Sequence, residues 1–564
     1  MKRQNMKRQD SNYPYYQEKN FSTTKELLNF CAKEYDDKVA YMFKRENRVC
    51  SVTYTQFFNE INALGTALLS EGMADRHVAV FGDNSYEWIS VYHAVMASNA
   101  VLVPVDRELP PEGLTHVMND GDVSFVFVGS NYFEKLKGIL DKLPRVEKVF
   151  ILDDKPVDGY SSVNQLKARG AELMSNGDRS YIDLRIDPEA LTSILFTSGT
   201  TGVSKGVMLS QRNICADFSN ALKNMHIHSN CLSVLPYHHA YESSMQICYL
   251  VKGRTICINE SLRMFVSNMK LYKPYDILVV PLFVETIYNR IWAQAEEGGK
   301  DKMLRKLIAV SKKLRSAGLD VRRKLFKSIY SNFGGNLTRF ICGGAPLKPY
   351  IAEFFDDIGI EVLTGYGITE CSPLVCVNRD YFYDSYSCGI VIPECEIKIK
   401  SPDENGEGEI LVRGKNVMMG YYKNPEATKE AFDGDWFLTG DIGRIDEKGR
   451  LFITGRKKNI IVLKNGKNIY PEEMEYYFAE SPNIAEIIVS AVKDSEDNEA
   501  YLQAEIFPKP EVTEKIGREQ VEKLIREEVN TVNDKLPNYK HIKKVTFRTE
   551  EFEKTTTKKI VRKY

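Results

Sequence analysis

The chain has 564 residues, of which 76 are lysine or arginine and 77 are aspartate or glutamate, so its formal net charge is −1. This length predicts several domains, and the charge balance excludes a global attraction to nucleic acid. No apolar run approaches the about 20 residues that a spanning helix needs, and the polar first residues lack a signal-peptide core. The 11 cysteines form no Cys-x-x-Cys pair and no zinc spacing with histidine, which favours a reducing cytoplasm.

The first two thirds of the chain predict an α/β domain. Residues 77–81 form a buried apolar run, residues 82–85 resemble a turn with a helix cap, and an apolar-periodic helix follows to about Ala97. Residues 101–105 are the next expected strand, so this segment is a βαβ unit and implies a parallel sheet. Further strands are expected at 123–128, 148–152, 276–280 and 339–342.

The pattern changes after about residue 380. Alternating segments near 396–400 and 409–413, and a turn at 446–449, predict an antiparallel, barrel-like subdomain over about 380–455. Helices and strands then alternate in a small α+β domain that includes a charged helix at about 518–533. We therefore expect a polar tail at 1–20, a large domain at 21–456 and a small domain at 457–564.

The run from Thr197 to Gly206 is the strongest chemical signal. It combines hydroxyl residues, glycines and Lys205 after an apolar run, which suits a polyphosphate because backbone N–H groups, hydroxyls and a cation all meet anionic oxygens. The Walker A spacing fails because Gly206 follows Lys205, and the nucleophile elbow fails because Phe196 occupies its first glycine position. A flexible surface loop is the alternative for such a composition.

Three other segments carry residues that suit a nucleotide, and a fourth segment is basic. Residues 343–347 place glycines before a helix, Tyr366 to Glu370 combine an aromatic, a hydroxyl and a carboxylate, and Asp441 follows the apolar residues 436–438. Taken alone, each of these segments is equally compatible with an ordinary turn or loop. A basic segment at 554–560 is, by itself, a solvated tail.

These five segments belong to a set of six motifs whose order along the chain resembles that of the acyl-adenylate-forming (AMP-binding) superfamily, and the resemblance extends from about residue 20 to the end. It implies two α/β subdomains, a barrel-like subdomain and a small mobile C-terminal domain that turns about Lys458. The resemblance assigns the ATP phosphates to Thr197, Ser198, Gly199, Thr200, Thr201, Gly202 and Lys205. It assigns the adenosine moiety to Gly344, Ala345, Pro346, Tyr366, Gly367, Asp441 and Arg456, the last two at the ribose.

The resemblance also implies the catalytic groups. Thr369 is expected at phosphate, Glu370 at Mg²⁺, and Lys559 at the carboxylate and the α-phosphate. This segment departs from the superfamily pattern, because Lys558 replaces the usual glycine and Glu553 the usual proline. Gly466 matches the loop that lines the thiol tunnel.

The acyl group is inferred from Leu235 to Glu242, which resembles long-chain fatty acyl-CoA synthetases and has no aspartate for an amino-acid ammonium group. His239 and Gly365 are the expected acyl-site residues. The resemblance thus implies a cytoplasmic fatty acid:CoA ligase, monomeric or homodimeric, with peripheral membrane contact left open. The alternatives are a medium-chain or aryl acid:CoA ligase, a fatty acyl-AMP ligase that loads a carrier protein, and a non-catalytic ATP-binding regulator.

Overall fold

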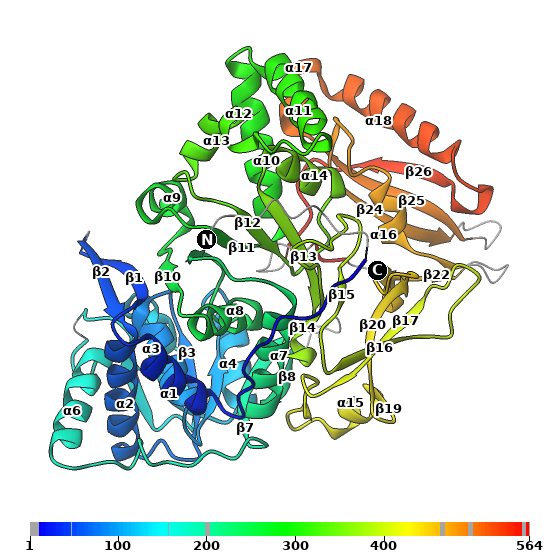
Figure 1. Ribbon diagram of the computed structural model, residues 1–564. Helices are drawn as coiled ribbons and strands as arrows, with labels where there is room; N and C mark the ends of the chain where they lie inside the picture. The colour runs from blue at the N-terminus through cyan, green and yellow to red at the C-terminus, as the bar shows by residue number, and fades with distance from the viewer. Residues whose placement is uncertain are drawn as a thin grey trace. The chain divides into compact units, whose positions relative to one another are not determined.

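The computed structural model describes residues 11–46, 48–155, 157–197, 204–462, 468–493, 500–554 and 560–562. The chain forms two compact units, which are treated separately below. Unit 1 comprises residues 1–396 and 412–437, and unit 2 comprises residues 397–411 and 438–564. Helices and strands are mixed in both units, which confirms the predicted α/β class (Figure 1).

A nine-stranded sheet is one of the two large sheets of unit 1. Its strands lie in the order β15 (Ile390–Val391), β14 (Leu374–Val377), β13 (Glu361–Gly367), β12 (Arg339–Cys342), β11 (Asp276–Val279), β9 (Asn230–Ser233), β10 (Thr255–Ile258), β1 (Val39–Arg45) and β2 (Arg48–Thr53). The strands from β13 to β1 are parallel, and the edge strands are antiparallel. Its core includes Ile277, Phe340 and Phe355, which are fully buried.

A seven-stranded sheet is the second. Its order is β18 (Gly420–Tyr421), β8 (Lys205–Ser210), β7 (Leu191–Thr197), β4 (Val101–Pro104), β3 (His77–Phe81), β5 (Val123–Val128) and β6 (Lys148–Ile151). The strands β4, β3, β5 and β6 pair in parallel, as the βαβ pattern predicts. The strands β7 and β8 form an antiparallel hairpin, to which β18 adds from far along the chain.

The helices of unit 1 connect and cover these strands. They are α1 (Thr24–Tyr35), α2 (Tyr54–Ser70), α3 (Tyr86–Met96), α4 (Pro111–Asp120), α5 (Phe133–Lys137), α6 (Val163–Ser175), α7 (Gln211–Asn224), α8 (Ala240–Val251), α9 (Phe265–Tyr272), α10 (Pro281–Glu297), α11 (Asp301–Ser316), α12 (Arg322–Leu325), α13 (Lys327–Asn332), α14 (Pro349–Ile358) and α15 (Pro425–Glu430). Side-chain caps begin several of them. Ser85 accepts a hydrogen bond from the Trp88 amide at 3.1 Å at the start of α3, where the sequence predicts a cap.

The first described residues of the chain pack against a later part of unit 1, the segment after β14. The Arg379 guanidinium, which is buried after β14, donates to Asn12 Oδ1 at 2.6 Å and to the Pro14 carbonyl at 3.1 Å. Tyr16 donates its hydroxyl to Asp380 at 2.7 Å. Figure 1 shows this segment in blue, running past β14. Residues 12–16 are therefore held by specific polar contacts.

The chain passes between the two units within the strands of a third sheet. This sheet contains β16 (Cys395–Lys400), β17 (Gly408–Gly414), β20 (Trp436–Ile445), β19 (Phe432–Asp433) and β21 (Leu451–Arg456). The rest of unit 2 contains β22 (Ile461–Val462), β23 (Asn468–Ile469), α16 (Pro471–Tyr476), β24 (Ile484–Lys493), β25 (Ala500–Pro508), α17 (Pro510–Ile516), α18 (Arg518–Asn533) and β26 (Ile542–Phe547). The helix expected at about 518–533 is confirmed. Among the helices built from described residues, none is long and apolar enough to cross a membrane.

Candidate active site

The carboxyl ends of strands in both large sheets carry the polar segments that the sequence singles out. His238 and His239 follow β9, and Gly343 and Gly344 follow β12. Asn84, which follows β3 of the other sheet, donates to the Leu235 carbonyl at 2.7 Å and accepts from the Tyr237 amide at 3.2 Å. The two sheets thus bring their carboxyl ends to one place, which is where open α/β folds bind ligands.

The phosphate run connects the two strands of the β7–β8 hairpin. Thr197 and Lys205 are paired across the hairpin, and the Thr197 hydroxyl donates to the Lys205 carbonyl at 3.5 Å. Five predicted phosphate ligands, Ser198, Gly199, Thr200, Thr201 and Gly202, lie outside the described residues. The base of the loop is nevertheless defined, and it places the Lys205 side chain beside β18.

Thr369 and Glu370 lie on a short 3-10 helix (Thr369–Cys371) directly after β13. The sequence suggests a loop around Tyr366 and Gly367, but both belong to β13, because this strand pairs with β14 as far as Gly367. A Cβ at Gly367 would lie 2.5 Å from the Pro373 carbonyl oxygen. Glycine therefore allows the close backbone approach that turns the chain towards Glu370.

Tyr421 connects the phosphate run to Glu370, and the sequence analysis missed it. Its hydroxyl donates to Glu370 Oε1 at 2.9 Å, and Lys205 Nζ lies 4.9 Å from the centroid of its ring. Burial and the negative charge of Glu370 raise the pKa of Tyr421, so it stays a hydrogen-bond donor. No sequence signal marks this tyrosine, because only the pairing of β18 with β8 brings it here.

The predicted adenine segment begins where β12 ends. Gly344 has a φ of +87°, which favours glycine, and Gly344, Ala345 and Pro346 are exposed. Tyr366 is 7% exposed, so it offers little ring surface to a ligand in this conformation. Tyr241 of α8 lies under this segment and donates its hydroxyl to the Ile341 carbonyl at 2.8 Å.

The predicted acyl residues are His239 and Gly365. The rings of His238 and His239 are 4.2 Å apart, and burial, followed by the charge of His239, lowers the pKa of His238 to about 3. His238 Nε2 lies 3.8 Å from Asp106 Oδ2, beyond the end of β4. A Cβ at Gly365 would lie 3.1 Å from the Cys376 carbonyl oxygen, so sheet packing also favours glycine there.

In unit 2, Asp441 pairs with Arg456 across β20 and β21, and Arg456 Nε lies 2.7 Å from Asp441 Oδ1. The expectation that Asp441 lies beyond a strand end is wrong, because β20 continues to Ile445 through its pairing with β21. The Asp441 side chain is 4% exposed and that of Arg456 43%, so the pair is open to solvent on the arginine side.

The positions of Lys458, Gly466 and Lys559 also belong to unit 2. Partial desolvation, followed by the charges of Arg456 and Arg562, lowers the pKa of Lys458. Gly466 and Lys559 lie outside the described residues. A bridge between Lys554 and Ile560 closes the base of the segment that contains Lys559.

Comparison with known proteins agrees with this arrangement. The model of the AMP-binding enzyme family matches residues 29–422, and that of the AMP-binding enzyme C-terminal domain matches residues 458–564. The chain therefore belongs to the AMP-binding enzyme family.

Two relatives and one solved structure illustrate the similarity. The long-chain-fatty-acid–CoA ligase 1 of Homo sapiens is 29% identical over 502 residues, covering 81% of this chain and 69% of that protein. The chloroplastic long-chain-fatty-acid–acyl-carrier-protein ligase AEE15 of Arabidopsis thaliana is 30% identical over 562 residues, covering 86% and 76%. The anthranilate CoA ligase AuaEII in complex with anthranoyl-AMP matches the fold with a TM-score of 0.75 at 19% identity, covering 98% and 96%. The family and these relatives support an AMP-forming acyl ligase.

Proposed function

We propose that the protein is a long-chain fatty acid:CoA ligase of the AMP-forming type. The acid attacks the α-phosphorus of ATP to give an acyl-adenylate and pyrophosphate, and the CoA thiol then displaces AMP to give acyl-CoA. The observation that carries this proposal is the contact of Lys205 and Glu370, which come from two distant motifs, with the ring and the hydroxyl of Tyr421.

The adenylation reaction needs positive charge around the ATP phosphates. A free carboxylate is a poor acyl donor, and its attack on phosphorus concentrates negative charge on the phosphoryl oxygens. Lys205 is assigned to the β- and γ-phosphates, Thr369 to phosphate, and Lys559 to the reacting carboxylate and α-phosphate. Such groups lower the barrier when they point at the charge that develops in the transition state.

The residues present fit Mg²⁺ as a cofactor. Mg²⁺ is usually bound by one or two carboxylates together with substrate phosphates, and Glu370 supplies one carboxylate. Among the described residues, no group of three or more His, Cys, Asp or Glu side chains forms a metal cluster of its own. When bound, the ion would supply positive charge that neutralises the phosphates, and the Tyr421 hydroxyl would hold the Glu370 carboxylate in place through its hydrogen bond to Oε1.

Seven residues are assigned to the adenosine moiety. Gly344, Ala345, Pro346, Tyr366 and Gly367 are assigned to adenine, and Asp441 and Arg456 to the ribose. We place the boundary between the large and small domains at 456/457, with Lys458 as the hinge. The small domain then turns between the two half-reactions, and Gly466 lines the path of the CoA thiol.

The acid is inferred from the segment Leu235 to Glu242, which runs from the loop after β9 into the first turn of α8. It has no aspartate for an ammonium group, and its single carboxylate, Glu242, is fully buried and accepts hydrogen bonds from Ser233 and the Leu235 amide. An uncharged acyl chain beside His239 and Gly365 is therefore favoured, and the human relative bears the name of a long-chain ligase. The Arabidopsis relative makes a carrier-protein thiol the second candidate acceptor.

Pyrophosphate exchange tests the proposal. We expect ATP–pyrophosphate exchange with acids between C8 and C18, and acyl-thioester formation when CoA is added. Exchange without turnover on CoA, but with turnover on a phosphopantetheinyl carrier protein, would identify the second acceptor. Absence of exchange with every acid in this range would refute the fatty-acid assignment, and absence with aryl acids as well would leave the non-catalytic regulator.

Lys559 has its own test because Lys558 occupies the usual glycine position. Removing a cation aimed at the transition state costs about 3 kcal/mol of barrier, a rate factor of about 10². We expect Lys559→Ala to slow adenylation by this factor and to leave thioester formation from preformed adenylate almost unchanged. Lys558→Ala is the matched control. Equal losses in both half-reactions, or a larger loss in Lys558→Ala, would contradict the assignment.

A further inference from the structure

Positive charge is concentrated in one part of unit 1. Residues 302–335 contain ten lysine or arginine residues and one acidic residue, Asp320, a net charge of +9 in a chain whose total is −1. This segment comprises most of α11 together with α12 and α13. Two sets of these cations have contrasting surroundings.

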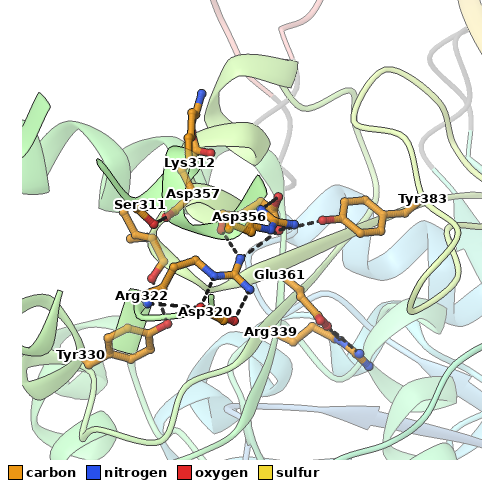
Figure 2. Close-up of polar contacts among 12 residues, drawn as sticks. Ser311, Lys312, Asp320, Arg322, Tyr330, Arg339, Asp356, Asp357, Glu361 and Tyr383 are labelled. Carbon is orange, nitrogen blue, oxygen red and sulfur yellow. Dashed lines mark hydrogen bonds and ion pairs between the residues drawn. The ribbon is translucent and has the colours of Figure 1, made fainter. Parts of the chain in front are cut away.

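The first set faces the protein and is neutralised by the end of α14 (Figure 2). Asp356 Oδ2 lies 2.7 Å from Arg315 Nη1, and Asp356 Oδ1 lies 3.5 Å from Arg322 Nη1. Lys312 Nζ lies 2.9 Å from Asp357 Oδ2, and the Tyr383 hydroxyl donates to Asp356 at 2.7 Å. These contacts fasten α11 and α12 to α14, so the opposite side of α11 has a fixed orientation.

The second set, Lys306 and Lys313, lies on that opposite side together with Met303 and Val310. We term these four residues the α11 face. Their spacings of three, four and three residues put them on one helical stripe. Met303 is 52% exposed and Val310 47%, and Lys306 and Lys313 are exposed. Neither lysine forms an ion pair with any other described residue. Lys302, next to Met303 at the N-terminal end of α11, is also exposed.

A second stripe of exposed residues lies at α9, which is linked to α11 through α13 and α12. This stripe consists of Leu262, just before α9 (Phe265–Tyr272), and of Val266 and Lys270 within it, at four-residue spacing. Leu262 is 68% exposed and Val266 43%. The helix α13 contacts α9 and α12, and α12 contacts α11. Figure 1 shows α13 and α12 between α9 and α11. Seven of the fifteen exposed large apolar side chains among the described residues lie between 262 and 319.

We propose that the α11 face docks on an anionic lipid bilayer. Lysines with no carboxylate partner complement anionic headgroups, and each contributes roughly a fivefold gain in binding near such a surface. Alternating exposed Met and Val side chains insert into the headgroup–acyl boundary, as in interfacial amphipathic helices. A soluble polyanion would use the lysines but would leave these apolar side chains in water.

Vesicle sedimentation with the full-length protein tests this proposal. It requires no ATP, acid or CoA, so its result is independent of the proposed ligase activity. We expect binding to phosphatidylcholine vesicles that contain 40 mol% phosphatidylglycerol, and weak binding to pure phosphatidylcholine. The double variant Lys306→Gln/Lys313→Gln should reduce the partition coefficient about 25-fold, and Met303→Ser/Val310→Ser about tenfold.

The matched control is Lys142→Gln/Lys429→Gln, which makes the same charge change at exposed lysines elsewhere in unit 1 and should bind like the wild type. Thermal unfolding identifies any variant that fails to fold. The proposal is overturned if the wild type does not bind anionic vesicles, or if the control loses as much binding as the lysine variant. It is also overturned if the serine variant binds normally while heparin competes fully, because the face would then bind a soluble polyanion.

Discussion

Tyr421→Phe is the most direct perturbation of the candidate site. The substitution removes only the hydroxyl that donates to Glu370 Oε1 at 2.9 Å and leaves the ring beside Lys205 in place. A hydrogen bond to a charged group contributes about 1.5–3 kcal/mol, and losing the partner that orients a metal ligand typically costs about 10–100-fold in metal affinity or activity. We therefore expect the Mg²⁺ concentration at half-maximal pyrophosphate exchange to rise at least about tenfold.

Tyr422→Phe is a matched control in the adjacent residue. The Tyr422 hydroxyl also donates to a carboxylate, Asp122 Oδ2, at 2.8 Å, but Asp122 belongs to none of the phosphate motifs. The Mg²⁺ midpoint, measured at saturating ATP and acid, should therefore differ between the two variants. Their unfolding temperatures should be lowered by similar amounts. A merely structural role for Tyr421 predicts lower stability with an unchanged Mg²⁺ midpoint, and that outcome would refute the reasoning.

Three other perturbations test the remaining parts of the structure. Asp441→Asn removes the charge that pairs with Arg456 at 2.7 Å, so the KM for ATP should rise about tenfold. The Tm should change little, because half-exposed ion pairs contribute little stability. An unchanged KM would exclude the ribose assignment. Burial raises the pKa of Glu242 to about 7, well above that of a solvated glutamate. The folded state therefore retains a proton that the unfolded chain releases, and the free energy of unfolding falls as the pH rises towards 7. Glu242→Gln should abolish this dependence, at most about 3 kcal/mol, when free energies of unfolding at pH 5 and pH 8 are compared; the same pH dependence in both proteins would show that Glu242 does not titrate. Tyr16→Phe removes a hydrogen bond to buried Asp380 and should cost about 1–3 kcal/mol in urea unfolding, with faster proteolysis near residue 16; wild-type behaviour would mean that this contact does not hold the segment.

Local pattern predicted much of the fold. The strands β3 and β5 and the helix α18 have the bounds that the sequence suggests, because apolar periodicity and turn residues are properties of short segments. Strand continuation was less predictable. A loop is one interpretation of the segment around Gly367, and Asp441 is expected beyond a strand end. Both residues instead lie within strands, because β13 pairs with β14 and β20 pairs with β21.

The sequence by itself determined the family chemistry: the types of residue that meet phosphate, their order along the chain, and a positive segment at 302–335. Only the tertiary structure decided that Tyr421 contacts both Lys205 and Glu370, because that contact depends on a strand added to β8 from far along the chain. It also decided which cations of α11 are neutralised, because Asp356 and Asp357 reach only one side of the helix. Residue type and spacing are local properties, whereas the partner of each charge is set by how distant segments pack.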